Sequence, residues 1–347
     1  MRFLIIGAGA IGGYVGGSLA LGGHAVTFLA RAAIAASLRT VGLRLEDALS
    51  NQSRAINPVV AETPAEVQAS GPFDCAVLAT KAYDTAAAAR TLKLALPAPP
   101  PILCLQNGVD GETELATLFS AESLIAGTVT SAISKAGPGS LIIEKARGMG
   151  VALGHPLSQP LVAALNGAGL RARAYPASGP MKWSKLLTNL TGNATSAILD
   201  LTVAQVFADP NLFAVEMASL RETLAVMAAL SYPVVDLPGV PVRALAFASR
   251  LPAWLARPLL LRGVAGGRGG KMPSLHIDLH AGRPQTEVRW LHGAVAHHGA
   301  IAGVPAPVNQ MLYDTLEALS AGQLDKETFR SRPQALLARL PNTKPRP

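Results

Sequence analysis

The chain begins with a short apolar run that leads directly into a glycine-rich segment. Residues 2–6 read Arg-Phe-Leu-Ile-Ile, and the next six residues fit the pattern G-x-G-x-x-G. Such a pattern also occurs in glycine turns that bind nothing, but here it follows a predicted strand and precedes a predicted helix over residues 11–21, which is typical of a dinucleotide-binding turn. The first glycine permits a tight turn, the second lets a pyrophosphate approach the backbone, and the third allows close packing of helix on strand. The cofactor-binding residues predicted from this turn are Gly7, Ala8, Gly9, Ala10, Ile11 and Gly12.

Further apolar runs of strand length alternate with helical segments through the first half of the chain. These runs are residues 24–30, 73–80, 101–106 and 124–130. They lack a polar face, so each is expected to be buried on both sides, as in a parallel sheet covered by helices on both faces. The fold class predicted here is therefore α/β, with a Rossmann-like, doubly wound parallel sheet. Two later runs, residues 141–144 and 149–153, are predicted to add antiparallel strands to that sheet.

The pattern becomes helical beyond the segment Pro176-Ala-Ser-Gly-Pro180. Long segments with helical periodicity follow at residues 181–199, 211–230, 287–301 and 308–321. Between them, the glycine-rich stretch 263–270 is predicted to be a mobile loop. We expect a Rossmann-like NADP-binding domain over residues 1–177, a mainly α-helical substrate and catalytic domain over 178–340, and a disordered tail over 341–347.

Composition and charge exclude several classes of partner. The formal net charge is +8, but the basic residues are scattered and only 5% of residues are aromatic, so a nucleic-acid surface is not expected. No uninterrupted apolar run approaches the roughly 18 residues of a membrane helix, so we expect a cytoplasmic protein without a membrane partner. Cys75 and Cys104 lie in apolar runs and are predicted to be buried free thiols. The oligomeric state is left open, with a homodimer as one alternative.

The end of the second predicted strand indicates which nicotinamide cofactor is bound. An NAD or FAD site would place Asp or Glu there to bind the ribose hydroxyls. This chain instead reads Phe28-Leu-Ala-Arg31, with no carboxylate. A guanidinium can pair with a 2′-phosphate through two charged hydrogen bonds, although a solvated loop arginine is the simpler alternative. We predict that the cofactor is NADPH and that Arg31 binds its 2′-phosphate.

Polar residues at strand ends and on a helix complete the set of candidates. Thr80-Lys81 and Gln106-Asn107-Gly108 end two predicted parallel strands, whose carboxyl ends face the cofactor crevice. Lys185, Asn189 and Asn193 follow one another at intervals of four, which predicts one amine and two amides on a single helix face. An exposed polar stripe would have the same spacing.

Taken together, these residues resemble the ketopantoate reductase (2-dehydropantoate 2-reductase) family. The resemblance covers most of the chain and implies a small-molecule 2-oxo acid substrate, reduced by NADPH in a cleft between a Rossmann domain and a helical domain. The substrate would be 2-dehydropantoate, reduced to pantoate for pantothenate biosynthesis. Another branched or aromatic 2-oxo acid is an alternative, as is a non-catalytic NADPH-binding sensor. The residues that carry the likeness are the glycine motif, Thr80-Lys81, Leu105-Gln-Asn-Gly108, Lys185-x3-Asn189-x3-Asn193, Pro273-Ser274, Asp278, Gly282-Arg283, Thr286-Glu287 and Leu291-His-Gly293.

The resemblance also implies a role for each candidate side chain. Lys185 would be the catalytic acid, and Glu287 would orient that lysine or a substrate hydroxyl. Ser274 would bind the substrate carboxylate. The residues that would hold the substrate are Asn107, Asn189 and Asn193, and those that would add to the cofactor site are Arg31, Lys81 and Asn107.

Some features of the chain depart from the family pattern or suggest other sites. His292 stands where the family often has Asn, the stretch 283–287 is one residue longer than usual, and the insert 232–270 is longer than in compact members. His276 and His280 have the spacing of a helical zinc pair, but no third ligand lies nearby in the sequence, so no metal site is predicted. Residues 266–271 resemble a phosphate loop but lack its first glycine and its Ser/Thr.

Overall fold

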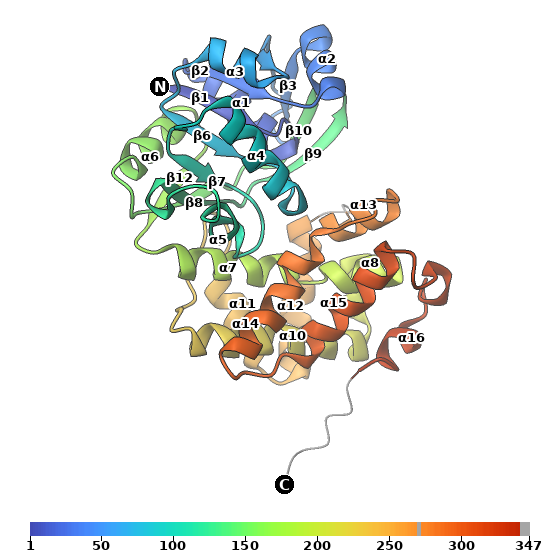
Figure 1. The fold of residues 1–347 in the computed structure, drawn as a ribbon. Coiled ribbons are helices and arrows are strands. Elements are labelled where there is room, and N and C mark those ends of the chain that lie inside the picture. Colours follow the sequence, from blue (N-terminus) through green and yellow to red (C-terminus); the bar gives the residue numbers. More distant parts are fainter. Residues whose placement is uncertain (269–271, 341–347) are drawn as a thin grey trace. The chain divides into compact units, whose positions relative to one another are not determined.

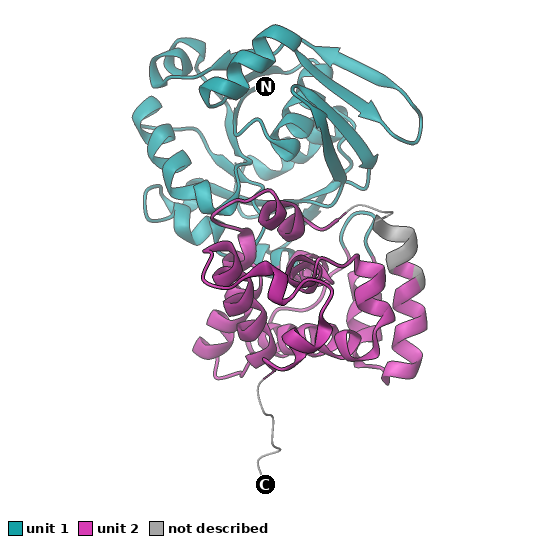
Figure 2. Cartoon of the chain, turned by 90° about the vertical axis from the view of Figure 1, so that its right-hand side faces the viewer, with its two compact units in different colours: residues 1–182, 237–240 teal, residues 183–236, 241–347 magenta. Residues whose placement is uncertain are grey.

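Figure 1 shows the computed structural model of the chain, which describes residues 1–268 and 272–340. The predicted tail at 341–347 lies outside the described residues. The chain divides into two compact units, one of residues 1–182 with 237–240 and the other of residues 183–236 with 241 onward (Figure 2). This division lies inside helix α7 (Ser178–Leu190), a few residues beyond the predicted domain boundary after residue 177.

The first unit is built on two β-sheets. Its strands are β1 (Arg2–Ile6), β2 (Ala25–Leu29), β3 (Leu43–Asp47), β4 (Ser53–Ile56), β5 (Val59–Ala61), β6 (Cys75–Leu78), β7 (Ile102–Cys104), β8 (Leu124–Val129), β9 (Ala132–Gly137), β10 (Ser140–Lys145), β11 (Met149–Ala152) and β12 (Ala172–Tyr175). Its helices are α1 (Ala10–Leu21), α2 (Ala32–Val41), α3 (Pro64–Ser70), η1 (Ala82–Asp84), α4 (Thr85–Ala95), α5 (Gly111–Leu115), η2 (Ala121–Ser123) and α6 (Ser158–Gly167).

The larger sheet has the strand order β12-β11-β8-β7-β6-β1-β2-β5. The six strands from β8 to β5 are parallel to one another, β11 is antiparallel to β8, and β12 is parallel to β11. The predicted doubly wound parallel sheet is confirmed, and so is the antiparallel strand predicted at 149–153.

The strand predicted at 141–144 exists as β10 but belongs to a different sheet. It pairs antiparallel with β9 and parallel with β3, in a four-stranded sheet of order β4-β3-β10-β9. Assigning it to the large sheet was therefore wrong. The physical reason lies in α1, because a Cβ added at Gly13 would lie 2.7 Å from Leu141 Cδ1, and one at Gly17 would lie 3.1 Å from Leu43 and Leu45. The glycine face of α1 therefore lets the second sheet pack closely against this helix.

The large sheet separates two hydrophobic cores. Alternate residues of β1 enter opposite cores, with Phe3 and Ile5 on one face and Leu4 and Ile6 on the other. This burial on both faces is what the apolar runs predict. The two cysteines, which lie in β6 and β7, are confirmed as buried free thiols, and burial raises the pKa of each to about 12.

The second unit is helical. Together with the end of α7 it contains α8 (Asn193–Leu199), α9 (Val203–Ala208), α10 (Pro210–Ala229), α11 (Val242–Arg250), α12 (Ala253–Arg268), α13 (Ser274–His280), η3 (Glu287–Trp290), α14 (His292–Ile301), α15 (Pro307–Ser320), η4 (Lys326–Thr328) and α16 (Pro333–Leu337). Within the described part of the chain, no helix combines the length and the apolar character that crossing a membrane requires.

The helical predictions hold in part. The segments 211–230 and 308–321 form α10 and α15 as expected. The segment 287–301 is instead a 3-10 turn followed by α14, because the backbone at Leu291 departs from helical geometry with φ −107° and ψ −92°. The loop predicted at 263–270 is also wrong as far as the structure describes it, since α12 continues to Arg268; residues 269–271 lie outside the described ranges.

Candidate functional site

The glycine turn between β1 and α1 has the shape expected of a dinucleotide-binding turn. Gly7 adopts φ +96°, a conformation that favours glycine. A Cβ added at Gly12 would lie 1.9 Å from the carbonyl oxygen of Gly7, so the third glycine allows the helix to pack on the turn. In contrast, a Cβ at Gly9 would meet nothing within 4 Å. Gly9 also precedes α1 without a side-chain cap, which leaves open space and backbone N–H groups for a phosphate.

Arg31 lies at the start of α2, just beyond the end of β2. Its side chain is 88% exposed, and its Nη2 atom lies 3.7 Å from Asp84 Oδ2. An exposed ion pair of this length contributes little to stability. The guanidinium is therefore accessible to an anionic group at the end of the second strand, although Asp84 is an acidic neighbour that the sequence pattern does not reveal.

A buried glutamine joins the ends of β6 and β7. Gln106 Nε2 lies 3.1 Å from Thr80 Oγ1, 3.1 Å from the carbonyl oxygen of Lys81 and 2.9 Å from Thr85 Oγ1, and its two N–H bonds are directed among these acceptors. These bonds hold the segment that carries Lys81 beside the segment that carries Asn107. The sequence pattern identifies Gln106 only as a neighbour of Asn107, and its bridging role depends on contacts across 21 to 26 residues.

A second lysine near the candidate residues is buried and paired. Lys182 on α7 is only 4% exposed, and its Nζ atom lies 3.0 Å from Glu112 Oε1. It also donates to the carbonyl oxygens of Gln106 and Gly127 at 3.0 and 3.3 Å. Burial by itself lowers the pKa of Lys182, but the Glu112 carboxylate opposes this, and the net shift is upward. The ammonium thus stays charged in a structural role within the first unit.

Lys185 and Asn189 lie one helical turn apart on α7, but Asn193 does not continue that helix. The helix ends at Leu190, Gly192 adopts φ +63°, and Asn193 is the first residue of α8. The predicted single helix over 181–199, and with it the single face for all three residues, is therefore wrong. A buried carboxylate stabilises the break, since Glu216 on α10 accepts hydrogen bonds from the Gly192 N–H and from Thr195 Oγ1, both at 2.6 Å.

Asn193 is instead bonded to the first turn of α13. Its Oδ1 atom accepts the N–H of Leu275 at 3.1 Å, and its Nδ2 atom donates to the carbonyl oxygen of Asn189 at 2.9 Å and to Ser274 Oγ at 3.5 Å. The fold thus brings together Asn193 and Ser274, which are 81 residues apart. Glu287, the other candidate in this unit, is 2% exposed at the start of η3.

We expect Gly192→Ala to lower the free energy of unfolding by about 2 kcal/mol or more, because a side chain would be strained at this φ and crowded as well. The added Cβ would lie 2.5 Å from Val203 Cγ1. Gly303→Ala is the matched control, since Gly303 has φ +69° but a Cβ there meets nothing within 4 Å. Urea titrations of both variants measure the difference, and equal losses would contradict the crowding by Val203.

His292 is buried in a polar network of the second unit. Its Nδ1 atom lies 2.9 Å from Asn309 Oδ1, which also accepts a hydrogen bond from Ser219 Oγ at 2.8 Å. The Asn309 amide nitrogen donates to Glu222 Oε2 and to the carbonyl oxygen of Ser219, so Asn309 Oδ1 acts as an acceptor and His292 Nδ1 as the donor. Burial lowers the pKa of His292 to about 4, so the imidazole is neutral at pH 7.

This shift predicts a dependence of stability on pH. Between pH 4 and 6.5 the unfolded chain takes up a proton at His292 that the folded chain does not. The contribution of neutral His292 to the free energy of unfolding is therefore complete above the pKa that this histidine has in the unfolded chain. It decreases as the pH falls toward 4, by about 3 kcal/mol in total. We expect His292→Asn to flatten the fall in unfolding free energy from pH 7 to 4.5, whereas His297→Asn, at an exposed position of α14, leaves it unchanged. Parallel curves for wild type and His292→Asn would refute this assignment.

The candidate residues are divided between the two units. The first unit holds the glycine turn with Arg31, Lys81 and Asn107. Lys81 follows β6 and Asn107 follows β7, so both residues lie just beyond the carboxyl ends of neighbouring parallel strands. The second unit holds Lys185, Asn189, Asn193, Ser274 and Glu287. Glu216 and Lys182 were missed by sequence reasoning, because nothing in their local sequence distinguishes a buried, bonded charge from an exposed one.

Two family models match this chain, one in its N-terminal part and one in its C-terminal part. The family model described as ketopantoate reductase PanE/ApbA matches residues 3–152, and the model of the C-terminal part of that family matches residues 180–320. A 2-dehydropantoate 2-reductase of Halobacterium salinarum is 29% identical over 90% of this chain and 97% of its own length. One from Mesorhizobium japonicum is 28% identical over 88% and 94%.

Solved structures show the same architecture. A PanE/ApbA family ketopantoate reductase from Ralstonia eutropha has a TM-score of 0.77 at 27% identity, covering 93% of this chain and 99% of that one. D-mandelate dehydrogenase, solved with NADH and anilino(oxo)acetate, has a TM-score of 0.76 over the same shares at 20% identity, which indicates likeness of fold. Because the two family models together match most of the chain in the expected order, this chain belongs to the ketopantoate reductase PanE/ApbA family and is an oxidoreductase of the 2-dehydropantoate 2-reductase type.

Proposed function

We propose that the chain uses NADPH to reduce a 2-oxo acid to the 2-hydroxy acid, and that its substrate is 2-dehydropantoate, reduced to pantoate for pantothenate biosynthesis. The observation that carries this proposal is the match of both family models over residues 3–152 and 180–320. Relatives named 2-dehydropantoate 2-reductase align over about nine-tenths of the chain and support the same substrate.

The residues of the first unit fit a dinucleotide cofactor. The open space at Gly9 and the uncapped start of α1 suit a pyrophosphate, and the closed packing at Gly12 holds the helix in place to receive it. The exposed Arg31 guanidinium suits a 2′-phosphate. NADPH bound there would supply a hydride for the carbonyl carbon of the substrate.

The proposed acid is Lys185. Hydride addition builds negative charge on the ketone oxygen, which needs a positive group to stabilise it and a donor to protonate it. A lysine ammonium serves both needs, and Asn189, one turn further along α7, can hydrogen-bond the substrate without adding charge. Asn107 is proposed to contribute a third polar contact, and Glu287 to orient the lysine or a substrate hydroxyl.

Asn193 and Ser274 are proposed to act together on the substrate carboxylate. The bonds of Asn193 to Ser274 Oγ and to the N–H of Leu275 support this pairing, because they hold the first turn of α13 and with it the serine hydroxyl. In this arrangement Asn193 positions Ser274 as well as belonging to the proposed substrate-binding set.

A direct assay tests the proposal. The loss of NADPH absorbance is followed with 2-dehydropantoate and with a panel of branched and aromatic 2-oxo acids, using wild-type protein and Lys185→Met. We expect the highest kcat/KM with 2-dehydropantoate. A higher value for another 2-oxo acid would reassign the substrate, and tight NADPH binding without turnover on any member would favour a sensor.

A further inference from the structure

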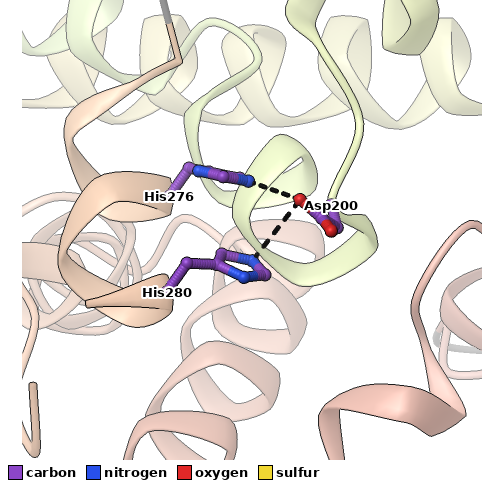
Figure 3. Close-up of side chains that lie close together, drawn as sticks. All are labelled: Asp200, His276 and His280. Atoms are coloured by element: carbon purple, nitrogen blue, oxygen red, sulfur yellow. Dashed lines mark hydrogen bonds and ion pairs between the residues drawn. The ribbon is translucent and has the colours of Figure 1, made fainter. Parts of the chain in front are cut away.

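Two histidines and an aspartate meet at one edge of the second unit. His276 and His280 lie one turn apart on α13, and their rings stack with centroids 4.1 Å apart and an interplanar angle of 20°. Asp200 is the residue that follows α8, and its carboxylate faces both imidazoles (Figure 3). One ligand atom of each residue lies within 4.8 Å of the other two.

The distances between these atoms fit a small divalent ion. Asp200 Oδ1 lies 2.7 Å from His276 Nε2 and 3.9 Å from His280 Nε2. Zinc bonds to imidazole nitrogen and carboxylate oxygen of about 2.0–2.2 Å place tetrahedral ligand atoms roughly 3.3–3.5 Å apart. The two distances lie on either side of this value. Small side-chain rotations, with the Nε2 proton of each histidine released and the other ring nitrogen protonated, would bring both nitrogens and the oxygen to bonding distance of one ion.

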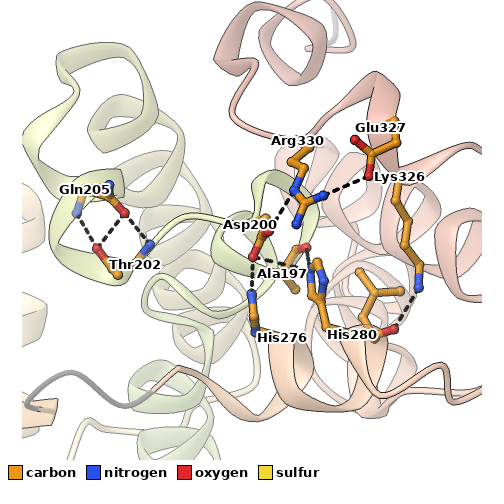
Figure 4. A network of polar contacts seen from close by, with 10 residues as sticks. Ala197, Asp200, Thr202, Gln205, His276, His280, Lys326, Glu327 and Arg330 are labelled. Carbon is orange, nitrogen blue, oxygen red and sulfur yellow. Dashed lines mark hydrogen bonds and ion pairs between the residues drawn. The ribbon is translucent and has the colours of Figure 1, made fainter.

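The backbone and the outer contacts hold Asp200 in this orientation. Asp200 has φ +52°, and the turn that follows it is closed by Thr202 and Gln205, which cap α9 through reciprocal hydrogen bonds. Arg330 Nε donates to Asp200 Oδ2 at 3.1 Å, which leaves Oδ1 directed at the histidines (Figure 4). A hydrogen-bonded second oxygen is the usual arrangement for a carboxylate that ligates a metal.

The surrounding charges set the expected strength of binding. His276 Nε2 donates a hydrogen bond to Asp200 Oδ1 at 2.7 Å, so the carboxylate already attracts a positively polarised group at this position. Opposing this, the Arg330 guanidinium lies beside the carboxylate, although Glu327 pairs with Arg330 at 3.1 Å. The adjacent cation weakens the attraction of the carboxylate for a second cation, so we expect a moderate affinity.

We propose that Asp200, His276 and His280 form a binding site for one divalent transition-metal ion such as Zn²⁺. Two imidazoles and one carboxylate leave the fourth tetrahedral position for water or another small ligand, and the His280 side chain, 28% exposed, lies where solvent reaches it. The sequence argument against a metal, that no third ligand lies nearby, does not hold in the fold, because Asp200 is 76 residues from His276.

An ion at this site would fasten α13 to α8. The same two helices begin at Ser274 and Asn193, which already contact each other. Toward the other end of α8, the hydrogen bond between His276 and Asp200 already links the two helices, and the metal would replace it with bonds to three side chains. We therefore expect Zn²⁺ to raise the melting temperature of the protein, by an amount that grows with free ion concentration. This inference does not depend on the proposed reductase function.

The test uses tag-free, metal-stripped protein titrated with Co²⁺ and then with Zn²⁺. We expect one Co²⁺ per chain with the intense visible absorption of a tetrahedral site, displaced by Zn²⁺, and a Zn²⁺-dependent rise in melting temperature. His280→Ala should weaken Co²⁺ binding by at least about 10- to 100-fold. His297→Ala, which removes an exposed histidine outside the cluster, should leave it unchanged.

A charge variant tests the position of the ion independently of the ligands. Arg330 is exposed, and Arg330→Gln removes the positive charge beside Asp200 while keeping a donor, so Co²⁺ should bind several-fold more tightly. The proposal is overturned if wild-type protein shows no tetrahedral Co²⁺ spectrum, if His280→Ala binds as wild type does, or if Arg330→Gln leaves the affinity unchanged. Circular dichroism of each variant confirms that it is folded.

Discussion

Replacing Lys185 with methionine is expected to lower kcat by about 10²- to 10⁴-fold while leaving NADPH binding nearly unchanged, the usual scale for the loss of a general acid. Methionine keeps the length and apolar stem of the lysine but removes the charge and the proton. The proposed cofactor contacts are residues of the first unit and do not include Lys185.

The measurement combines steady-state kinetics with an NADPH titration of the folded variant. Lys135→Met is the matched control, because Lys135 lies exposed on β9 in the other unit and is expected to keep wild-type turnover. If Lys185→Met retained kcat within a factor of about two, Lys185 would make no transition-state contact and would be removed from the mechanism.

Arg31→Asp is expected to reduce the preference for NADPH over NADH by some tens- to hundreds-fold in kcat/KM. The substitution removes the partner of the 2′-phosphate and introduces a charge that repels it. Because only NADPH carries this phosphate, the change lowers kcat/KM for NADPH relative to NADH. It also places a second carboxylate near Asp84, which pairs with Arg31 at 3.7 Å.

Asp84→Asn supplies a control that acts in the opposite direction. Removing this carboxylate frees Arg31 from its ion pair and removes a negative charge near the expected phosphate, so the preference for NADPH should rise modestly. Kinetics with both cofactors measures the ratio in each variant. An unchanged ratio in Arg31→Asp would falsify the assignment of Arg31 to the 2′-phosphate.

Local patterns accounted for features that depend on neighbours in the sequence. A strand that is apolar on both faces can be stable only inside a sheet covered on both sides, and this is where β1 lies, between two cores. The spacing of the glycines likewise predicted a turn that is tight at Gly7, open at Gly9 and closely packed at Gly12. Burial of the two cysteines followed from the same apolar runs.

Periodicity failed where a single residue interrupts a helix. The interval of four residues from Lys185 to Asn193 is the same in a continuous helix and in two helices joined at a break. The glycine between them permits the break, but the Glu216 carboxylate that stabilises it comes from α10, 24 residues further along the chain. Similarly, β10 has the composition of a strand, and only the approach of α1 through its small residues assigns it to the second sheet.

The sequence by itself determined the parallel sheet and the glycine turn, because each rests on short-range spacing of apolar and glycine residues. It indicated the family through the resemblance of an ordered set of short motifs along most of the chain. Only the tertiary structure decided that Asn193 bonds to the start of α13, that Gln106 joins two strand ends, and that Asp200 meets His276. The physical reason is that these polar groups are satisfied by partners 21 to 81 residues away. A local pattern shows that a side chain can form a hydrogen bond but not which distant group the fold brings to it.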